Sequence, residues 1–146
     1  MSDYVAVRDN IILKPVHNES IYNRVFVVSA YGGITNLLLE HKKNGTSGVY
    51  AEFANSLNDD SWMEAMEKLK QEIFSINQQL FKDKKTLNKA NEFIGERLDD
   101  AERVLADLQR LCQHGHFALD MHLATVREML ASIGEAHSAW NTATLL

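Results

Sequence analysis

Three long stretches of this sequence place apolar residues at alternating spacings of three and four positions. Such spacing puts the apolar side chains on one face of an α-helix, so each stretch predicts an amphipathic helix with a narrow apolar seam. Helices of this kind pack nearly antiparallel to bury their seams, which predicts a helical bundle. The seams consist of Trp62, Met66, Leu69, Ile73, Ile76 and Leu80; of Ile94, Leu98, Ala101, Leu105, Leu108 and Cys112; and of Leu119, Leu123, Val126, Leu130, Ile133, His137 and Trp140.

The N-terminal third of the chain has a different pattern. Residues 2–13 place apolar side chains loosely on one side of a helix, with Ser2 as its cap, and Lys14-Pro15 stops that helix because proline cannot continue it. Residues 24–30 form a short run of β-branched and aromatic residues without alternation. Such a run is typical of a strand covered on both faces, as in the parallel sheet of an α/β protein.

A glycine turn follows the predicted strand. Gly32 and Gly33 come directly after it, and Leu37 opens a predicted helix with Thr35 or Asn36 as its cap. Residues 44–48 predict a loop. We therefore expect a single partial domain over residues 1–146, with a strand and glycine-turn region at 1–48 and a helical region at 49–146. The chain should be predominantly α-helical, with one or two strands.

The composition limits which kinds of partner the protein can bind and in which cell compartment it is expected. The net charge of -5 over 146 residues includes no basic run long enough to follow a phosphodiester backbone, so we expect no nucleic acid as partner. No apolar stretch approaches the roughly 20 residues that cross a bilayer, and Asp3, Arg8 and Asp9 interrupt any signal-peptide core. We expect no membrane partner and a cytoplasmic location. The single Cys112 agrees with a reducing compartment.

Two places in the sequence could carry chemistry. Glycines after a buried strand let backbone N–H groups approach a phosphate or carboxylate closely, although glycines at such turns more often serve a positive φ. The second place is residues 132–138, where Gly134 and Glu135 lie inside a helical pattern. A glycine within a helix costs up to about 1 kcal/mol relative to alanine, which suggests close approach of another backbone or of a ligand.

Both places together resemble the aspartokinase family of the amino-acid kinase superfamily. Residues 24–38, Arg-Val-Phe-Val-Val-Ser-Ala-Tyr-Gly-Gly-Ile-Thr-Asn-Leu-Leu, resemble that family's Val-Val-Val-Ser-Ala-x-x-Gly-x-Thr-Asn-x-Leu block. Residues 130–138, Leu-Ala-Ser-Ile-Gly-Glu-Ala-His-Ser, resemble its Leu-x-Ser-x-Gly-Glu-x-x-Ser block. The order and separation of the blocks also match, so the resemblance covers nearly the whole chain. Residues 48–51, 108–116 and 125–129 are most similar to the ectoine-associated subgroup.

The resemblance implies an α/β amino-acid kinase fold and an activity. Aspartokinases transfer the γ-phosphoryl group of ATP, with Mg²⁺, to the side-chain carboxylate of L-aspartate, the committing step toward lysine, threonine, methionine or ectoine. By resemblance, Ser29, Gly32 and Gly33 border the reacting phosphate and aspartate. Thr35 hydrogen-bonds aspartate, and Glu135 holds its α-amino group. A hydroxyl suits a carboxylate, and an anionic side chain pairs with an ammonium.

The sequence also departs from the family. It contains no Lys-(Phe/Ile)-Gly-Gly-Thr-Ser motif, whose lysine neutralises the transferring phosphoryl group, and no match to the ATP-binding half. We therefore expect the chain to resemble an N-terminal part of the enzyme, with no catalytic residue, no bound cofactor and no turnover by itself. The competing hypothesis is a non-catalytic helical module that self-associates into a homo-oligomer through its seams or its strand. A zinc cluster of Cys112, His114, His116, Asp120 and His122 matches no common spacing, so we expect no metal site.

Overall fold

The computed structural model describes residues 4–14, 25–41, 43, 45–55, 59–113 and 117–146. In order along the chain, the helices are α1 (Tyr4–Val7) with a π-helical continuation η1 (Arg8–Ile12), α2 (Ile34–Leu38), α3 (Val49–Asn55), α4 (Ser61–Leu80), α5 (Lys84–Gln113) and α6 (Asp120–Leu145). The predicted helices at 2–13 and over the three apolar seams are confirmed within these ranges. Ser2, Pro15 and the break at 114–116 lie outside the described residues.

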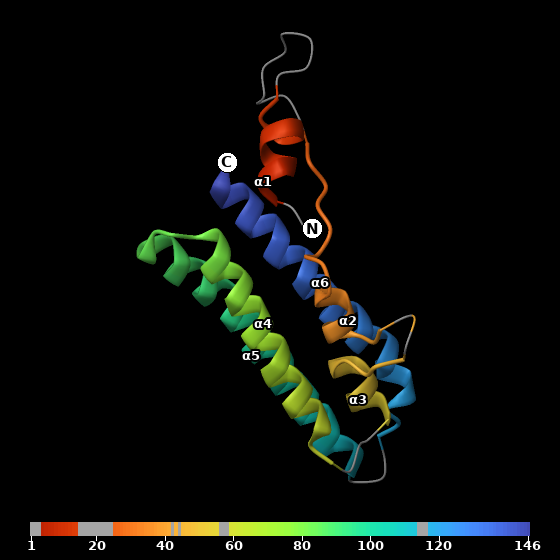
Figure 1. Ribbon diagram of the computed structural model, residues 1–146. Helices are drawn as coiled ribbons and strands as arrows, with labels where there is room; N and C mark the ends of the chain where they lie inside the picture. Colours follow the sequence, from red (N-terminus) through yellow and green to blue (C-terminus); the bar gives the residue numbers. More distant parts are fainter. Residues whose placement is uncertain (1–3, 15–24, 42, 44, 56–58, 114–116) are drawn as a thin grey trace.

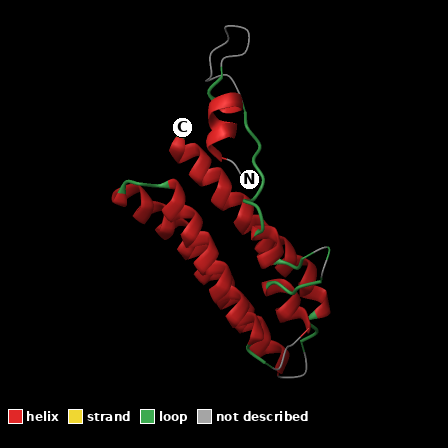
Figure 2. Cartoon of the chain, in the orientation of Figure 1, coloured by secondary structure: helices red, strands yellow, loops and turns green. Residues whose placement is uncertain are grey.

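Helices α4 and α5 form a long antiparallel hairpin, and α6 packs on α5 (Figure 1). Short helices α2 and α3 lie between α6 and the hairpin, and both contact α4 and α6. The predominantly helical class is therefore confirmed. Figure 2 shows the described chain as helices and loops throughout.

The start of each hairpin helix is fixed by an aspartate. Asp60 is the N-cap residue of α4, and Oδ1 of Asp59 accepts hydrogen bonds from the Ser61 amide at 3.0 Å and hydroxyl at 2.6 Å. Before α5, Oδ2 of Asp83 accepts a hydrogen bond from the Thr86 amide at 2.8 Å. A carboxylate at a helix start satisfies free N–H groups and interacts favourably with the helix dipole. These contacts help to fix the residues at which α4 and α5 begin.

The core runs along the predicted seams. The buried seam residues are joined by others from α2, α3 and the glycine turn, so that one contiguous cluster spans all the packed helices. Seam positions at the helix ends, such as Leu80 and Cys112, are only half-buried and lie against its edge. The fully buried large side chains are Phe53, Trp62, Ile34, Leu38, Met66, Leu69, Ile73, Ile94, Leu98, Leu105, Leu130 and His137.

The two tryptophans occupy opposite ends of the hairpin. Near the start of α4, the Trp62 indole packs edge-on against Phe53, and its Nε1–H donates to Oε1 of Gln109 at 3.2 Å. At the other end, Trp140 of α6 stacks on Phe93 with ring centroids 5.3 Å apart. Each end of the hairpin is thus closed by its own aromatic group.

The predicted strand is wrong for the described residues 25–30. They form neither helix nor strand, and the Val25 and Val27 side chains are 93% and 96% exposed. A strand is stabilised by a ladder of hydrogen bonds with a neighbouring strand, and the described residues form no such ladder; the one bridge among them joins Glu40 to Ser47. The segment instead runs in the open toward α2 (Figure 1).

The predicted cap of the following helix is also wrong. Helix α2 begins at Ile34, and its N-cap is Gly33 with a φ of 88°, without a side-chain cap hydrogen bond. Glycine adopts this left-handed conformation without the steric cost that a side chain brings. The turn therefore closes earlier than expected, and Thr35 lies inside the helix, where its carbonyl accepts a hydrogen bond from the Leu39 amide.

Candidate functional site

The two predicted chemical segments meet at Gly134 of α6. A Cβ atom added to Gly134 would lie 2.9 Å from Cβ of Ala30, 3.1 Å from Cδ1 of Leu38 and 3.3 Å from Cγ2 of Ile34. These distances are shorter than ordinary van der Waals contact, so no side chain fits there without movement. The close approach predicted from a glycine within a helix is confirmed, and the neighbour is the segment around the glycine turn.

The five predicted site residues lie around this junction. Ser29, Thr35 and Glu135 are each next in sequence to a residue of the Gly134 contact, and their side chains are exposed. Gly32 and Gly33 are exposed in the turn between the extended segment and α2. The structure therefore brings the two blocks together, and it places Gly32 and Gly33 in the wall of a pocket.

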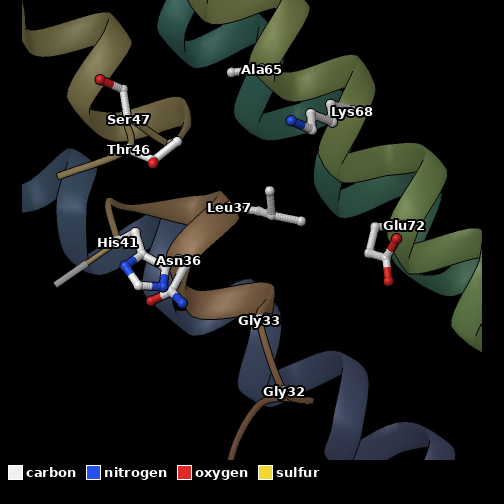
Figure 3. Close-up of a pocket in the computed structure, with 11 residues that line it drawn as sticks. Gly32, Gly33, Asn36, Leu37, His41, Thr46, Ser47, Ala65, Lys68 and Glu72 are labelled. Atoms are coloured by element: carbon white, nitrogen blue, oxygen red, sulfur yellow. The ribbon is translucent and has the colours of Figure 1, made fainter. Parts of the chain in front are cut away.

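That pocket has a volume of about 430 Å³ and lies between the glycine turn, the loop before α3 and one face of α4 (Figure 3). Ser29, Thr35 and Glu135 are not part of its lining. The sequence-based interpretation missed nine lining residues, because they become neighbours only when α4 packs against α2. Besides Gly32 and Gly33, the pocket is lined by Asn36, Leu37, His41, Thr46, Ser47, Gly48, Ala65, Lys68 and Glu72.

Gly48 holds the loop side of the pocket against α2. A Cβ atom at this position would lie 2.5 Å from the carbonyl oxygens of Asn36 and Leu37, which are backbone atoms and cannot turn aside. The Gly48 amide donates to the Leu39 carbonyl at 3.1 Å, and the His41 amide donates to the Thr46 carbonyl at 2.8 Å. The wall is therefore built by backbone contacts.

The α4 side of the pocket carries opposite charges one helical turn apart. Ala65, Lys68 and Glu72 follow a spacing of three and four, so they share one face of α4, and Figure 3 shows them opposite Leu37. Within the part of the chain that the structure describes, neither Lys68 nor Glu72 forms an ion pair. By contrast, Nζ of Lys70 lies 2.9 Å from Asp99 and 2.6 Å from Glu102 on α5. The pocket thus keeps one ammonium and one carboxylate available.

A buried polar cluster, formed by Tyr31, Asn77, His137 and Asn141, lies beside the glycine turn. Nε2 of His137 is 2.7 Å from Oδ1 of Asn77, and Nδ2 of Asn141 donates to the same oxygen at 2.8 Å. Nε2 also lies 3.0 Å from Nδ2 of Asn141, so the three side chains meet at this nitrogen. Nδ1 is buried and has no hydrogen-bond partner among the described residues.

Burial sets the protonation of this cluster. It lowers the pKa of His137 to about 4, because a charged imidazolium would lose its hydration. Burial also raises the pKa of Tyr31 to about 12, an effect that the Asn141 side chain partly offsets. The Tyr31 ring meets the His137 ring edge-on at 5.1 Å. His137 is thus a neutral histidine in the core.

Two further classes of site are not found among the described residues. These residues contain no group of three or more His, Cys, Asp or Glu side chains that could hold a metal ion; His114 and His116 lie outside them. Nor do they contain a helix with the length and hydropathy required to cross a membrane.

The contacting segments are those by which the sequence resembles the aspartate kinases, a class within the amino-acid kinases. Comparison confirms the resemblance: over all 146 residues the chain is 49% identical to the aspartate kinase Ask_Ect of Stutzerimonas stutzeri (strain A1501). The similarity to the ectoine-associated subgroup is confirmed with it. The chain spans 31% of the length of that relative. No family model and no solved structure matches the chain.

Proposed function

We propose that this chain supplies the aspartate-binding part of an aspartate kinase with an α/β amino-acid kinase fold. The reaction transfers the γ-phosphoryl group of ATP to the side-chain carboxylate of L-aspartate. The 49% identity to a named aspartate kinase over the whole chain supports the class. The observation that carries the proposal is the contact of Gly134 with Ala30 and Ile34, which brings the two family blocks together.

Each proposed residue has a task that its chemistry suits. Ser29 and the amides of Gly32 and Gly33 border the phosphate and the reacting carboxylate. The Thr35 hydroxyl donates to an aspartate carboxylate, and the Glu135 carboxylate pairs with the α-ammonium group. Phosphoryl transfer depends mostly on positioning and charge compensation, which fixed hydrogen-bond donors provide.

The proposal assigns no residue of this chain to Mg²⁺ or ATP. The described residues contain no cluster of side chains that could hold a metal ion. The transferring phosphoryl group needs a lysine or an equivalent cation, and the family motif that carries this lysine does not occur among these residues. The 146-residue chain by itself is expected to show no aspartyl phosphate formation above background.

Aspartate binding tests the proposal directly. Calorimetric titration of the chain with L-aspartate should show saturable binding, and Glu135→Gln should weaken it about tenfold or more by removing the ammonium partner. Glu128→Gln is the matched control, because Glu128 is exposed on the same helix about 10 Å earlier. Equal affinity in the two variants would contradict the role of Glu135, and absence of aspartate binding would contradict the proposed site.

A second candidate function is self-association without catalysis. It is favoured by the exposure of Val25 and Val27 in an extended segment. Such a segment can pair with the same segment of a second copy. Sedimentation velocity at increasing concentration should then show a dimer, and Val25→Thr with Val27→Lys should restore the monomer. A monomer at all concentrations would exclude this candidate.

A further inference from the structure

We propose that the pocket between the glycine turn and α4 binds a small α-amino acid with an apolar side chain, as its zwitterion. This site goes beyond the proposed function. The pocket shares Gly32 and Gly33 with the proposed aspartate site, but its charged residues, Lys68 and Glu72, have no part in that site.

The charges of the pocket select the class of ligand. An α-amino acid carries a carboxylate and an ammonium on the same carbon atom, and the pocket presents one group of each opposite sign. Lys68 and Glu72 are four residues apart on α4, so their Cβ atoms are about 6 Å apart, on one face. A simple anion such as phosphate would be repelled by Glu72, and a simple cation would be repelled by Lys68. A zwitterion satisfies both.

The other residues that line the pocket include polar and apolar side chains. Thr46, Ser47 and Asn36 line the pocket, and their hydroxyl and amide groups are of the kind that can hydrogen-bond the charged groups of a ligand. Leu37 and Ala65 offer apolar surface for its side chain. The volume of about 430 Å³ is larger than glycine or alanine needs. An aliphatic side chain should therefore increase affinity.

The wall of the pocket is formed before a ligand arrives. Gly48 is fixed against the carbonyl groups of Asn36 and Leu37, and the Glu40 to Ser47 bridge closes the loop. Gly45, with a φ of 68°, allows the loop to turn, and its amide donates to the His41 carbonyl at 2.9 Å. A preformed wall avoids the entropic cost of ordering a loop when the ligand binds.

The test uses amino acids that cannot accept a phosphoryl group on their side chain. L-leucine and L-alanine are titrated into the ¹⁵N-labelled chain, and the amide shifts of three lining residues without a role in the aspartate site, Thr46, Gly48 and Lys68, are followed. Both should shift these amides, with L-leucine binding about tenfold tighter because it buries more apolar surface. Inorganic phosphate should leave them unchanged. Shifts with phosphate alone, or no shift with either amino acid, would overturn the proposal.

Variants identify the charges that matter. Lys68→Gln and Glu72→Gln should each weaken L-leucine binding about tenfold, because each removes one charge-assisted contact. Lys89→Gln and Glu92→Gln are matched controls, since both residues are exposed on α5 outside the pocket, and they should bind as the unchanged chain does. Affinity unaltered by Lys68→Gln and Glu72→Gln would overturn the assignment.

Glu135→Gln separates the two sites. It should leave L-leucine binding unchanged while it weakens aspartate binding, so either proposal can fail without the other. Loss of L-leucine binding in Glu135→Gln would mean that the two sites are one, and would overturn the separate pocket.

Discussion

The buried imidazole of His137 makes the stability of this protein depend on pH in a defined window. In the folded chain, burial lowers the pKa of His137 to about 4, whereas an unfolded histidine titrates near 6.5. Above pH 6.5 the ring is neutral in both states, and its contribution to stability is fully present. As the pH falls toward 4, the unfolded chain takes up a proton that the folded chain excludes, so stability is lost.

The size of the effect follows from the two pKa values. Each pH unit between them costs about 1.4 kcal/mol, so the free energy of unfolding should fall by about 3 kcal/mol between pH 6.5 and pH 4. A loss of this size is large for a domain whose total stability is on the order of 10 kcal/mol. The structural cause is burial, which removes the water that would hydrate a charged ring.

Urea unfolding at closely spaced pH values measures this loss, and His137→Gln isolates it. Glutamine does not titrate, and its amide can still donate to Oδ1 of Asn77. Between pH 6 and pH 4.5, the free energy of unfolding of the variant should fall by about 1.4 kcal/mol less per pH unit than that of the unchanged chain. The carboxylates contribute equally to both proteins. Parallel curves for the two proteins would refute the reasoning. If the variant does not fold, a ring titration of His137 by NMR in the unchanged chain decides; protonation near pH 6.5 would refute it.

Three further changes test the packing. Gly48→Ala should lower the free energy of unfolding by about 3 kcal/mol, because its Cβ meets two backbone carbonyl oxygens; a neutral result in urea melts would show that the loop lies elsewhere. Leu98→Ala, at a fully buried position of α5, should cost about 3 kcal/mol by thermal or urea unfolding, and a loss under 1 kcal/mol would place Leu98 outside the core. Asp83→Ala should lower the free energy of unfolding by removing the acceptor of the Thr86 amide, whereas Lys82→Ala should leave it nearly unchanged; equal effects would argue against the cap.

The long helices could be predicted because their signal is local and repeated. Spacings of three and four over twenty or more residues fix both the helix and its buried face, and Ile73, Leu98 and Leu130 are buried as that pattern requires. Helix α3 has only seven residues, too few for the period to appear, and the sequence did not reveal it. The prediction of a strand at 24–30 was wrong, for the described residues 25–30, for a different reason. The composition of this segment is that of a strand, but strand formation depends on a partner that local composition does not report.

The candidate site also contains some residues that the sequence could predict and others that it could not. Gly134 was found because a glycine inside a helical pattern is locally unfavourable and needs a tertiary reason. The pocket residues on α4 carried no such signal: Lys68 and Glu72 lie on a polar helix face, where charged residues are ordinary. Gly48 could have been suspected from its loop, but its contact with Asn36 and Leu37 arises only when the loop folds back on α2. The roles of Ser29, Thr35 and Glu135 stay predictions, since the structure shows which residues surround them but does not show a ligand bound to them.

Because the two tryptophans lie far apart, their fluorescence reports separately on the two ends of the hairpin. Trp62 is enclosed by Phe53 and Gln109 where α4 begins, and Trp140 is stacked on Phe93 near the opposite end of the hairpin. Replacing either tryptophan by phenylalanine leaves emission from one end alone. Fraying of the bundle from one end would therefore change one signal before the other, and concerted unfolding would change both together.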